Sequence, residues 1–585
     1  MIKRAGSFLR HHIGFVCVAA VLVYCVVHAF DPPRLNWGDS YSDYNVMTAG
    51  RNFQKYGFLK MRLTPVLLDA SLVTQNDAKL IYTHYPQLPD LMNGVLRAVF
   101  HLSTLAQFRL VALMFSFGAL FFVYRLLEHY WSRDIAQIGL ALWVMNPLWV
   151  QHADYLHHVP YLSFFGFGGV YLLVQYLKRS HPEGTEGSAP PAVPTRKPWV
   201  YLLGASVFLF VLFTASYDGW FFVPLLYAFA AIAHHQRINR HVVIALGVPA
   251  AFAVAAMLFK FGTNVWALGG VASFVRDLHF QWVERAAGPA AKIPFTTGVW
   301  PTIVGRVERC FSLLLFPVAL FWLAAPFIRQ RLPRLASLGP NPGFLFLAAL
   351  PFLWIFVQLW ILQYYPTLLV LPFYAVACAA AISLLAGSTT RMARVAAAVL
   401  FAALIGNSVD ETLRFKKAFF DPSAIRSLRA QLDSLSAPGQ FIMVNHMWDS
   451  AYGYFFDRNT VLLSINPPER IDAALRYYTD PKKNRVAPAT GAIFVQHKHL
   501  ADELIDKGFY YVAAREGLWN EWAEPERYRA RIKTVIDQRD SLLVDRVSRI
   551  GHRVYDSDYY ALWVIPPRTD VSRSNAGTPG PSHQN

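Results

Sequence analysis

Residues 37–57 read WGDSYSDYNVMTAGRNFQKYG, and this stretch directly follows the first long apolar run of the chain. It places two carboxylates, Asp39 and Asp43, in a short aromatic-rich segment from which a helical pattern continues. Asp43 lies where a helix could begin, and an acid there is stabilised by the unpaired N–H groups of the first turn. A cap of this kind is worth about 1 kcal/mol. The alternative is a catalytic carboxylate, and this stretch alone does not separate the two.

The composition is that of a mainly α, polytopic membrane protein. The chain has 585 residues, of which 55% are hydrophobic, and its mean hydropathy is +0.29. It is therefore more apolar than an ordinary soluble protein. Apolar runs of about 18 residues or more are typical of membrane spans, and about eleven are expected here, some of them short. They are 13–30, 104–125, 135–151, 157–177, 199–215, 220–234, 242–260, 309–328, 343–362, 366–386 and 394–410.

The basic residues indicate how these spans are oriented. With the N-terminus in the cytoplasm, every short loop on that side carries Lys or Arg, whereas the opposite loops 151–156, 216–219 and 363–365 carry none. Because positive residues are enriched in cytoplasmic loops, we expect a cytoplasmic N-terminus with a retained signal anchor. An odd number of spans then puts the C-terminal part outside. Two long outer segments are expected, 31–103 and 261–308.

The character of the chain changes after residues 1–410, which we assign to the membrane domain. In residues 411–568, helix-like and β-rich stretches alternate, which predicts a small extracytoplasmic α/β domain. Asn445, His446 and Asp449 follow its first strand and fit an ordinary hydrogen-bonded loop better than a site. The tail 569–585 is expected to be disordered. Helices are expected at 424–435, 469–478 and 500–507, and strands at 440–444, 460–465, 492–495, 509–513 and 560–565.

Charge, cysteine and histidine patterns exclude several classes of function. The net charge is +17, but Lys and Arg lie between apolar runs rather than on one soluble domain, so no nucleic-acid partner is expected. The four cysteines lie inside apolar runs and form no disulfide framework. The segment HADYLHH suggests zinc on His152, Asp154 and His157. Its spacing matches no standard ligand pattern, so neither a metal nor another cofactor is expected.

Polar residues gather at the outer ends of several spans. A transporter would be expected to place ionisable groups near the middle of the membrane instead. The pattern favours a site at the outer membrane–water boundary, for a substrate whose reactive end lies at headgroup level. The residues are Asp39, Asp43, His84, His152, Asp154, His157, His158, Tyr217, Asp218, Gln363, Tyr364 and Tyr365.

Short motifs on the outer side follow one another in a characteristic order. They are Ala49-Gly50-Arg51-Asn52-Phe53 and Tyr56-Gly57 after the acids, Tyr82-Thr83-His84-Tyr85-Pro86, Phe108-Arg109-Leu110, Ser216-Tyr217-Asp218-Gly219-Trp220 with Pro224, and Gln363-Tyr364-Tyr365 with Pro372. Together they resemble the GT-C glycosyltransferases, in the branch of the protein O-mannosyltransferases (family 39) and lipid A aminoarabinose transferases, over roughly residues 10–410. The sequence departs from the family where an Asp is usually followed by Glu, since Ser40 and Tyr44 follow the two acids.

The resemblance implies inverting transfer of a sugar from a polyprenyl-phosphate donor to an extracytoplasmic glycan, lipid or protein. The first-loop acid is then the catalytic base, and register slightly favours Asp43 over Asp39. The expected location is a bacterial inner membrane. A transporter or flippase of a lipid-linked sugar, or a non-catalytic membrane protein of envelope assembly, are the alternatives.

Physical chemistry supplies the remaining roles at such a site. Nearby cations stabilise a departing lipid phosphate, and a carboxylate within about 3 Å can remove the proton of an acceptor hydroxyl. Asp154 and Asp218 would orient hydroxyls, although Asp218 equally fits a turn before Gly219. The candidate cations are Arg51, His84, Arg276, Arg285 and Lys292. The other expected substrate-binding residues are Tyr85, His158, Tyr217, Gln363 and Tyr364.

Overall fold

The computed structural model divides into two compact units, residues 1–420 with 506–530 and residues 421–505 with 531–585. We describe each unit by itself. The described residues are 2–32, 34–36, 40–67, 81–83, 85–180, 197–235, 240–282, 299–328, 335, 338–355, 365–414, 418–419, 422–445, 454–463, 468–480, 491–498 and 525–567.

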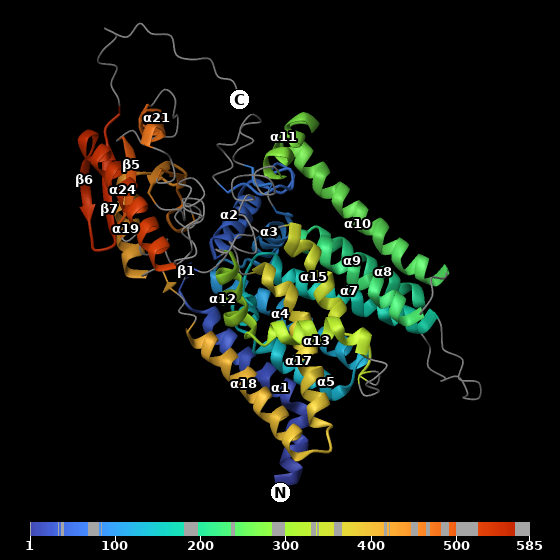
Figure 1. The fold of residues 1–585 in the computed structure, drawn as a ribbon. Helices are drawn as coiled ribbons and strands as arrows, with labels where there is room; N and C mark the ends of the chain where they lie inside the picture. The colour runs from blue at the N-terminus through green and yellow to red at the C-terminus, as the bar shows by residue number, and fades with distance from the viewer. Residues whose placement is uncertain are drawn as a thin grey trace. The chain divides into compact units, whose positions relative to one another are not determined.

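The first unit is a helical bundle (Figure 1). A short antiparallel ladder joins β1 (Arg34–Asn36) to β2 (Ala418–Phe419), so that the chain just before the first outer helix pairs with the chain after the last helix. The helices are α1 (Ile2–Ala29), α2 (Ser40–Tyr56), α3 (Leu88–Phe100), α4 (Leu105–Tyr130), α5 (Arg133–Val144), α6 (Pro147–His152), α7 (His158–Ser180), α8 (Pro198–Phe213), α9 (Tyr217–His235), α10 (Arg240–Ala267), α11 (Val271–Trp282), α12 (Val299–Phe311), α13 (Leu315–Ile328), α15 (Gly343–Ile355), η4 (Tyr365–Val370), α17 (Leu371–Ala386) and α18 (Arg391–Arg414).

Five of the described helices are long and apolar enough to cross a membrane, as in a multi-pass membrane protein. They are His12–Ala29, Leu105–Tyr130, Arg240–Ala267, Thr367–Ala386 and Arg391–Arg414. Shorter apolar helices lie at Pro198–Phe213, Tyr217–Ala233 and Leu315–Phe327. The multi-pass architecture is therefore confirmed, while the expected count of eleven stays a prediction.

The expected span 135–151 is two helices, α5 and α6, rather than one. The break falls at Asn146 and Pro147, because proline lacks the N–H that would continue the helix. Asn146 Oδ1 caps α6 by accepting the backbone N–H groups of Leu148 (3.0 Å) and Trp149 (3.3 Å). Asn146 Nδ2 also donates to the carbonyl of Cys310 at 2.6 Å, so this break is fixed by the end of α12.

Small residues let the central helices approach closely. A Cβ added to Gly168 would lie 2.6 Å from the ring of Phe208 on α8, and one added to Gly169 would lie 2.2 Å from the hydroxyl of Tyr227 on α9. That hydroxyl donates to the carbonyl of Ala205 at 2.8 Å. Side-chain packing and buried hydrogen bonds of this kind stabilise helix association in membranes. They hold the middle of α7 against α8 and α9.

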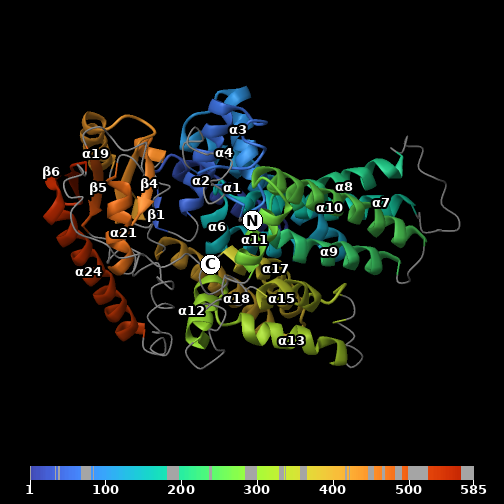
Figure 2. The same ribbon diagram turned by 90° about the horizontal axis from the view of Figure 1, so that it is seen from above.

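The second unit is a five-stranded sheet with strand order β4-β3-β5-β7-β6. Strand β3 (Phe441–Val444) is parallel to β4 (Asn459–Leu462) and β5 (Ala492–His497), whereas β7 (Tyr560–Ile565) is antiparallel to β5 and to β6 (His552–Asp556). The helices are α19 (Pro422–Leu435), α21 (Pro468–Tyr478) and α24 (Pro525–Ile550). Leu543 and Val547 of α24 share one hydrophobic core with Phe494 and Ile565 of the sheet. Figure 2 shows α24 lying beside the strands.

Two elements of this unit, α24 and β6, lie where the sequence predicted none. The expected strand 509–513 and helix 500–507 lie outside the described residues, as do His446 and Asp449. The remaining predicted elements agree with the observed ones to within a few residues.

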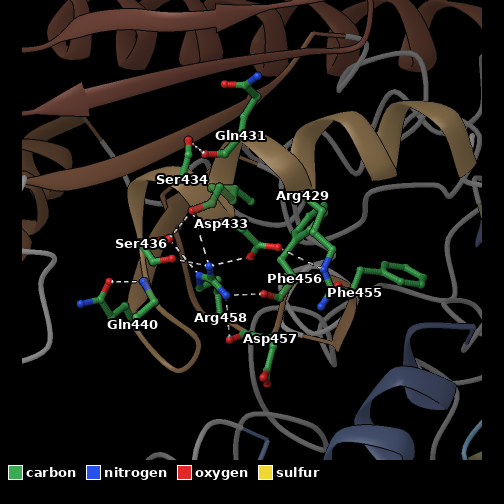
Figure 3. A network of polar contacts seen from close by, with 12 residues as sticks. Arg429, Gln431, Asp433, Ser434, Ser436, Gln440, Phe455, Phe456, Asp457 and Arg458 are labelled. Carbon is green, nitrogen blue, oxygen red and sulfur yellow. Dashed lines mark hydrogen bonds and ion pairs between the residues drawn. The ribbon is translucent and has the colours of Figure 1, made fainter.

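A buried arginine joins α19 to β4. Figure 3 shows Arg458 surrounded by the end of α19 and the turn before β4. Its guanidinium donates to Ser436 Oγ (2.8 Å) and to the carbonyls of Ser436 (2.5 Å) and Phe456 (2.7 Å), and it pairs with Asp433 Oδ1 at 2.9 Å. A cation at a helix C-terminus satisfies carbonyls that have no partner within the helix. Arg458 is therefore a structural residue of this unit.

Candidate functional site

The site is built around the first turn of α2. The helix begins at Ser40, so Asp43 lies within its first turn and not at the N-cap, which corrects the capping interpretation. The side chain is buried, with 2% of its surface exposed. Its Oδ1 accepts the backbone N–H of Leu156 at 2.9 Å. Helix α2 is thereby attached to residues 153–157, which connect α6 to α7.

Helix α4 also contacts the segment that connects α6 to α7. Arg109 of α4 is fully buried and donates to the carbonyls of Asp31 (2.9 Å) and Ala29 (3.4 Å), while its Nε lies 4.0 Å from Asp154 Oδ2. Ser116 donates to the carbonyl of Ala153 at 2.6 Å. Asp154 is therefore held by a structural cation, and the segment carrying it is anchored to α4 and to the end of α1.

Two adjacent histidines, His157 and His158, follow Leu156 along the chain, and an aspartate from α9 lies beside them. His157 Nδ1 contacts His158 Nδ1, and His158 Nε2 lies 3.1 Å from Asp218 Oδ2 at the start of α9. All three side chains are buried. The ring of Tyr85 stacks on His158 at 5.7 Å between centroids and meets His157 edge-on at 4.7 Å, while Tyr217 lies 6.3 Å from Tyr85. Four of the predicted residues thus lie together: Tyr85, His158, Tyr217 and Asp218.

A small apolar cavity of about 30 Å³ opens beside Asp218. Its walls come from α5, α6, α7, α9 and the η4–α17 segment, and they include Trp143, Trp149, Phe222 and Pro372. A cavity of this volume holds one or two waters. One edge of the polar cluster therefore borders an apolar surface within the bundle.

Tyr85 is positioned by a buried lysine that the sequence analysis missed. Lys260 of α10 is fully buried, and its Nζ donates to the carbonyl of Tyr85 at 2.8 Å. Gln87 Nε2 donates to Thr263 Oγ1 at 2.9 Å, which attaches the same segment one turn further along α10. Asp90 of α3 is also buried. Burial raises the pKa of Asp90 to about 7, while the charge of Lys260 opposes this shift.

A lone lysine in an apolar run was the available signal for this contact, because ionisable residues within membrane segments are seldom incidental. Lys260 nevertheless had no predicted role. Arg109 appeared only as part of a motif, with no partner assigned. Their partners lie far away in sequence, so local patterns could not identify them.

Two of the predicted cations lie among the described residues. Arg51 is half-buried on α2, and Arg276 is exposed on α11, where it donates to Ser273 at 3.2 Å. Among the described side chains, no three His, Cys, Asp or Glu groups are arranged as metal ligands, so the zinc alternative finds no support in this part of the chain. The other predicted positions lie outside the described residues: Asp39, His84, Arg285, Lys292, Gln363 and Tyr364.

Comparisons with known proteins identify the fold. No protein-family model and no curated protein matches the sequence. Among solved structures, the oligosaccharyltransferase AglB from Archaeoglobus fulgidus, in complex with an inhibitory peptide and a dolichol-phosphate, is 13% identical with a TM-score of 0.50, covering 88% of this chain and 72% of AglB. ArnT from Cupriavidus metallidurans, bound to undecaprenyl phosphate, is 11% identical with a TM-score of 0.51, covering 94% of this chain and 98% of ArnT. At this level of identity the likeness concerns the fold alone, and it shows that this chain has a fold like that of AglB and ArnT.

Proposed function

We propose that this protein is an inverting glycosyltransferase that moves a sugar from a polyprenyl-phosphate donor to an extracytoplasmic acceptor, with Asp43 as the base. The observation that carries the proposal is the buried Asp43 carboxylate, whose Oδ1 accepts the N–H of Leu156 in the segment that leads directly to His157 and His158. The structures of AglB and ArnT contain a dolichol-phosphate and undecaprenyl phosphate, respectively. A lipid phosphate is the donor class that agrees with both the sequence and the fold.

The chemistry assigned to Asp43 is general-base catalysis. The acceptor O–H or N–H loses its proton to the carboxylate while its heteroatom attacks the anomeric carbon of the sugar. The bond from that carbon to the phosphate oxygen breaks, its electron pair stays on the phosphate, and the configuration at carbon inverts. The hydrogen bond to Leu156 fixes the plane of the carboxylate, and the first turn of a helix favours its negative charge.

The other predicted roles remain part of this proposal. The leaving polyprenyl phosphate carries additional negative charge, which cations near the outer face would stabilise. Asp39 is retained as the second candidate base. The candidate cations are Arg51, His84, Arg276, Arg285 and Lys292, and the candidate contacts to sugar or acceptor are Tyr85, Asp154, His158, Tyr217, Asp218, Gln363 and Tyr364.

The test compares Asp43→Asn with the wild type by mass spectrometry of envelope lipids, glycans and proteins. The sugar mass lost when the gene is deleted identifies the product, and Asp43→Asn should reduce its formation about 100-fold to 10,000-fold, the range for loss of a general base. Asp39→Asn separates the two acids. Asp134→Asn is the matched control, because Asp134 also lies in the first turn of a helix, α5, away from this cluster.

The opposite result has a definite meaning. Unchanged product formation in both Asp39→Asn and Asp43→Asn, with normal amounts of protein in the membrane, would contradict an enzyme of this kind. Lys260 favours a transporter as the second candidate, because it is buried within an apolar helix and transport depends on ionisable groups within membrane helices. Lys260→Met would then abolish function, whereas Asp43→Asn would not.

A further inference from the structure

Asp218, His158 and His157 form a row of hydrogen-bonded side chains that come from two helices and one connecting segment. Asp218 begins α9, His158 begins α7, and His157 ends the segment from α6. The hydrogen bond between His158 Nε2 and Asp218 Oδ2 measures 3.1 Å, and 1% of His158 and 5% of His157 are exposed. Leu156, which donates to Asp43, is the residue directly before His157. The proposed base and this row of side chains are therefore attached to the same few residues of backbone.

The partners of each ring nitrogen determine where the protons lie. A carboxylate only accepts, so His158 Nε2 must carry a proton toward Asp218. In the neutral ring of His158, Nδ1 is then an acceptor, and the Nδ1 of His157 must donate to it. The neutral His157 ring consequently presents an unprotonated Nε2 on its opposite side. Asp218 thus fixes, through His158, which nitrogen of His157 can take up a proton.

Aromatic and ionisable groups surround the two rings. Tyr85 covers His158 and the edge of His157, and its backbone is held by Lys260. When His157 gains a proton at Nε2, the positive charge is compensated by Asp218 through His158. The ionisable groups that face this row of hydrogen-bonded side chains, or lie beside it, are Tyr85, Tyr217, Lys260, Asp90, Asp43 and the Arg109–Asp154 pair.

We propose that His157 binds the phosphate of the polyprenyl carrier and takes up one proton as it does so. This inference rests on the proposed function and deepens it. The Nε2–H of the protonated ring donates to a phosphate oxygen, where negative charge accumulates as the bond to the sugar breaks. His157 then contacts the lipid phosphate, whereas His158 and Asp218 are positioning residues that fix its tautomer and balance its charge. Asp43 keeps its separate role as the base that removes the proton from the hydroxyl or amine of the acceptor substrate.

Binding can be measured without any sugar or acceptor. Isothermal titration calorimetry of the full-length protein in detergent, with undecaprenyl phosphate in two buffers of different ionisation enthalpy near pH 7.5, gives the affinity and the number of protons taken up. The wild type should take up close to one proton. His157→Gln should abolish the uptake and weaken binding about tenfold, as expected for one lost charge-assisted hydrogen bond. Asp218→Asn should retain binding but move the proton uptake to lower pH, which loss of packing alone would not do.

Two controls make the outcome decisive. Undecaprenol, which lacks the phosphate, should bind without proton uptake, and His129→Gln, at the far end of α4, should leave both quantities unchanged. Binding of undecaprenyl phosphate with proton uptake that is insensitive to His157→Gln and Asp218→Asn would overturn this inference and leave the proposed function standing. Failure of the wild type to bind undecaprenyl phosphate would overturn both.

Discussion

Two buried polar networks in this molecule are organised in opposite ways. In the C-terminal unit, the guanidinium of Arg458 donates mainly to backbone carbonyls and a hydroxyl, and its charge is always present. In the membrane unit, His157, His158 and Asp218 contact one another through side chains that can change their protonation. Both networks are buried, so burial alone does not distinguish structure from function. The distinguishing property is whether the network can exchange a proton with a ligand.

The largest effect on stability is expected at Arg458. Arg458→Met should destabilise the C-terminal unit by about 3 kcal/mol, because several buried acceptors lose their donor at once. Pulse proteolysis of the full-length protein across a denaturant series measures this change. Arg429→Gln is the matched control, since Arg429 is half-exposed and lies in the same network. Equal losses in the two variants would remove the special status of Arg458.

At His158 the expected effect is on activity instead. His158→Gln should reduce product formation about 100-fold while the amount of folded protein in the membrane stays normal, because the tautomer of His157 is no longer fixed. Envelope mass spectrometry and membrane immunoblotting measure the two quantities. His129→Gln should change neither. If His158→Gln lowers product and protein amount in proportion, then this network is as structural as that of Arg458.

A substitution at Gly50 tests whether the packing of α2 against α3 holds Asp43 in place. A Cβ at this position would lie 1.9 Å from Asn93 Oδ1 on α3, so Gly50→Ala must displace the Asn93 side chain or move α2 away from α3. We expect a loss of about 1–3 kcal/mol in stability, together with reduced product formation. Thermal unfolding in detergent and envelope mass spectrometry check both. Gly247→Ala on α10, where nothing lies within 4 Å, should be tolerated, and equal effects of the two variants would contradict the packing argument.

The smallest effect is expected from Asp540 of α24, a titratable group within the structural unit. Burial raises the pKa of its carboxyl, and hydrogen bonds from Asn445 (2.6 Å) and Gln496 (3.4 Å) oppose the shift. The folded state therefore holds this proton more tightly than the unfolded state, whose pKa is near 3.8. The stabilisation is present below that pH and is lost as the pH rises through the folded-state pKa. Asp540→Asn should flatten this decline in pulse proteolysis between pH 4 and pH 7, and an unchanged decline would exclude Asp540 as its source.

Local patterns predicted much of the fold because apolar runs and strand-like stretches carry their own signal. The break at Asn146–Pro147 was also readable, since a proline after asparagine favours a turn or a helix start. Helix α24 was missed because its many charges mask an apolar stripe, although Ile536, Leu543 and Val547 recur at helical spacing and are buried. Tyr85, His158, Tyr217 and Asp218 were predicted as members of one site and lie together, but their geometry could not be predicted. Leu156 and Asp43 are 113 positions apart, so only the tertiary structure reveals their hydrogen bond.

Lys260 holds Tyr85 by its backbone carbonyl and not by its phenol ring. This hydrogen bond therefore does not depend on which side chain occupies position 85. Phe, Trp or His could replace the tyrosine and alter the aromatic cover over the two histidines, while the main chain kept its attachment to α10. Position 85 is thus a suitable site for engineering, because substitutions there would change the surroundings of His157, the proposed phosphate ligand, while the hydrogen bond from Lys260 is kept.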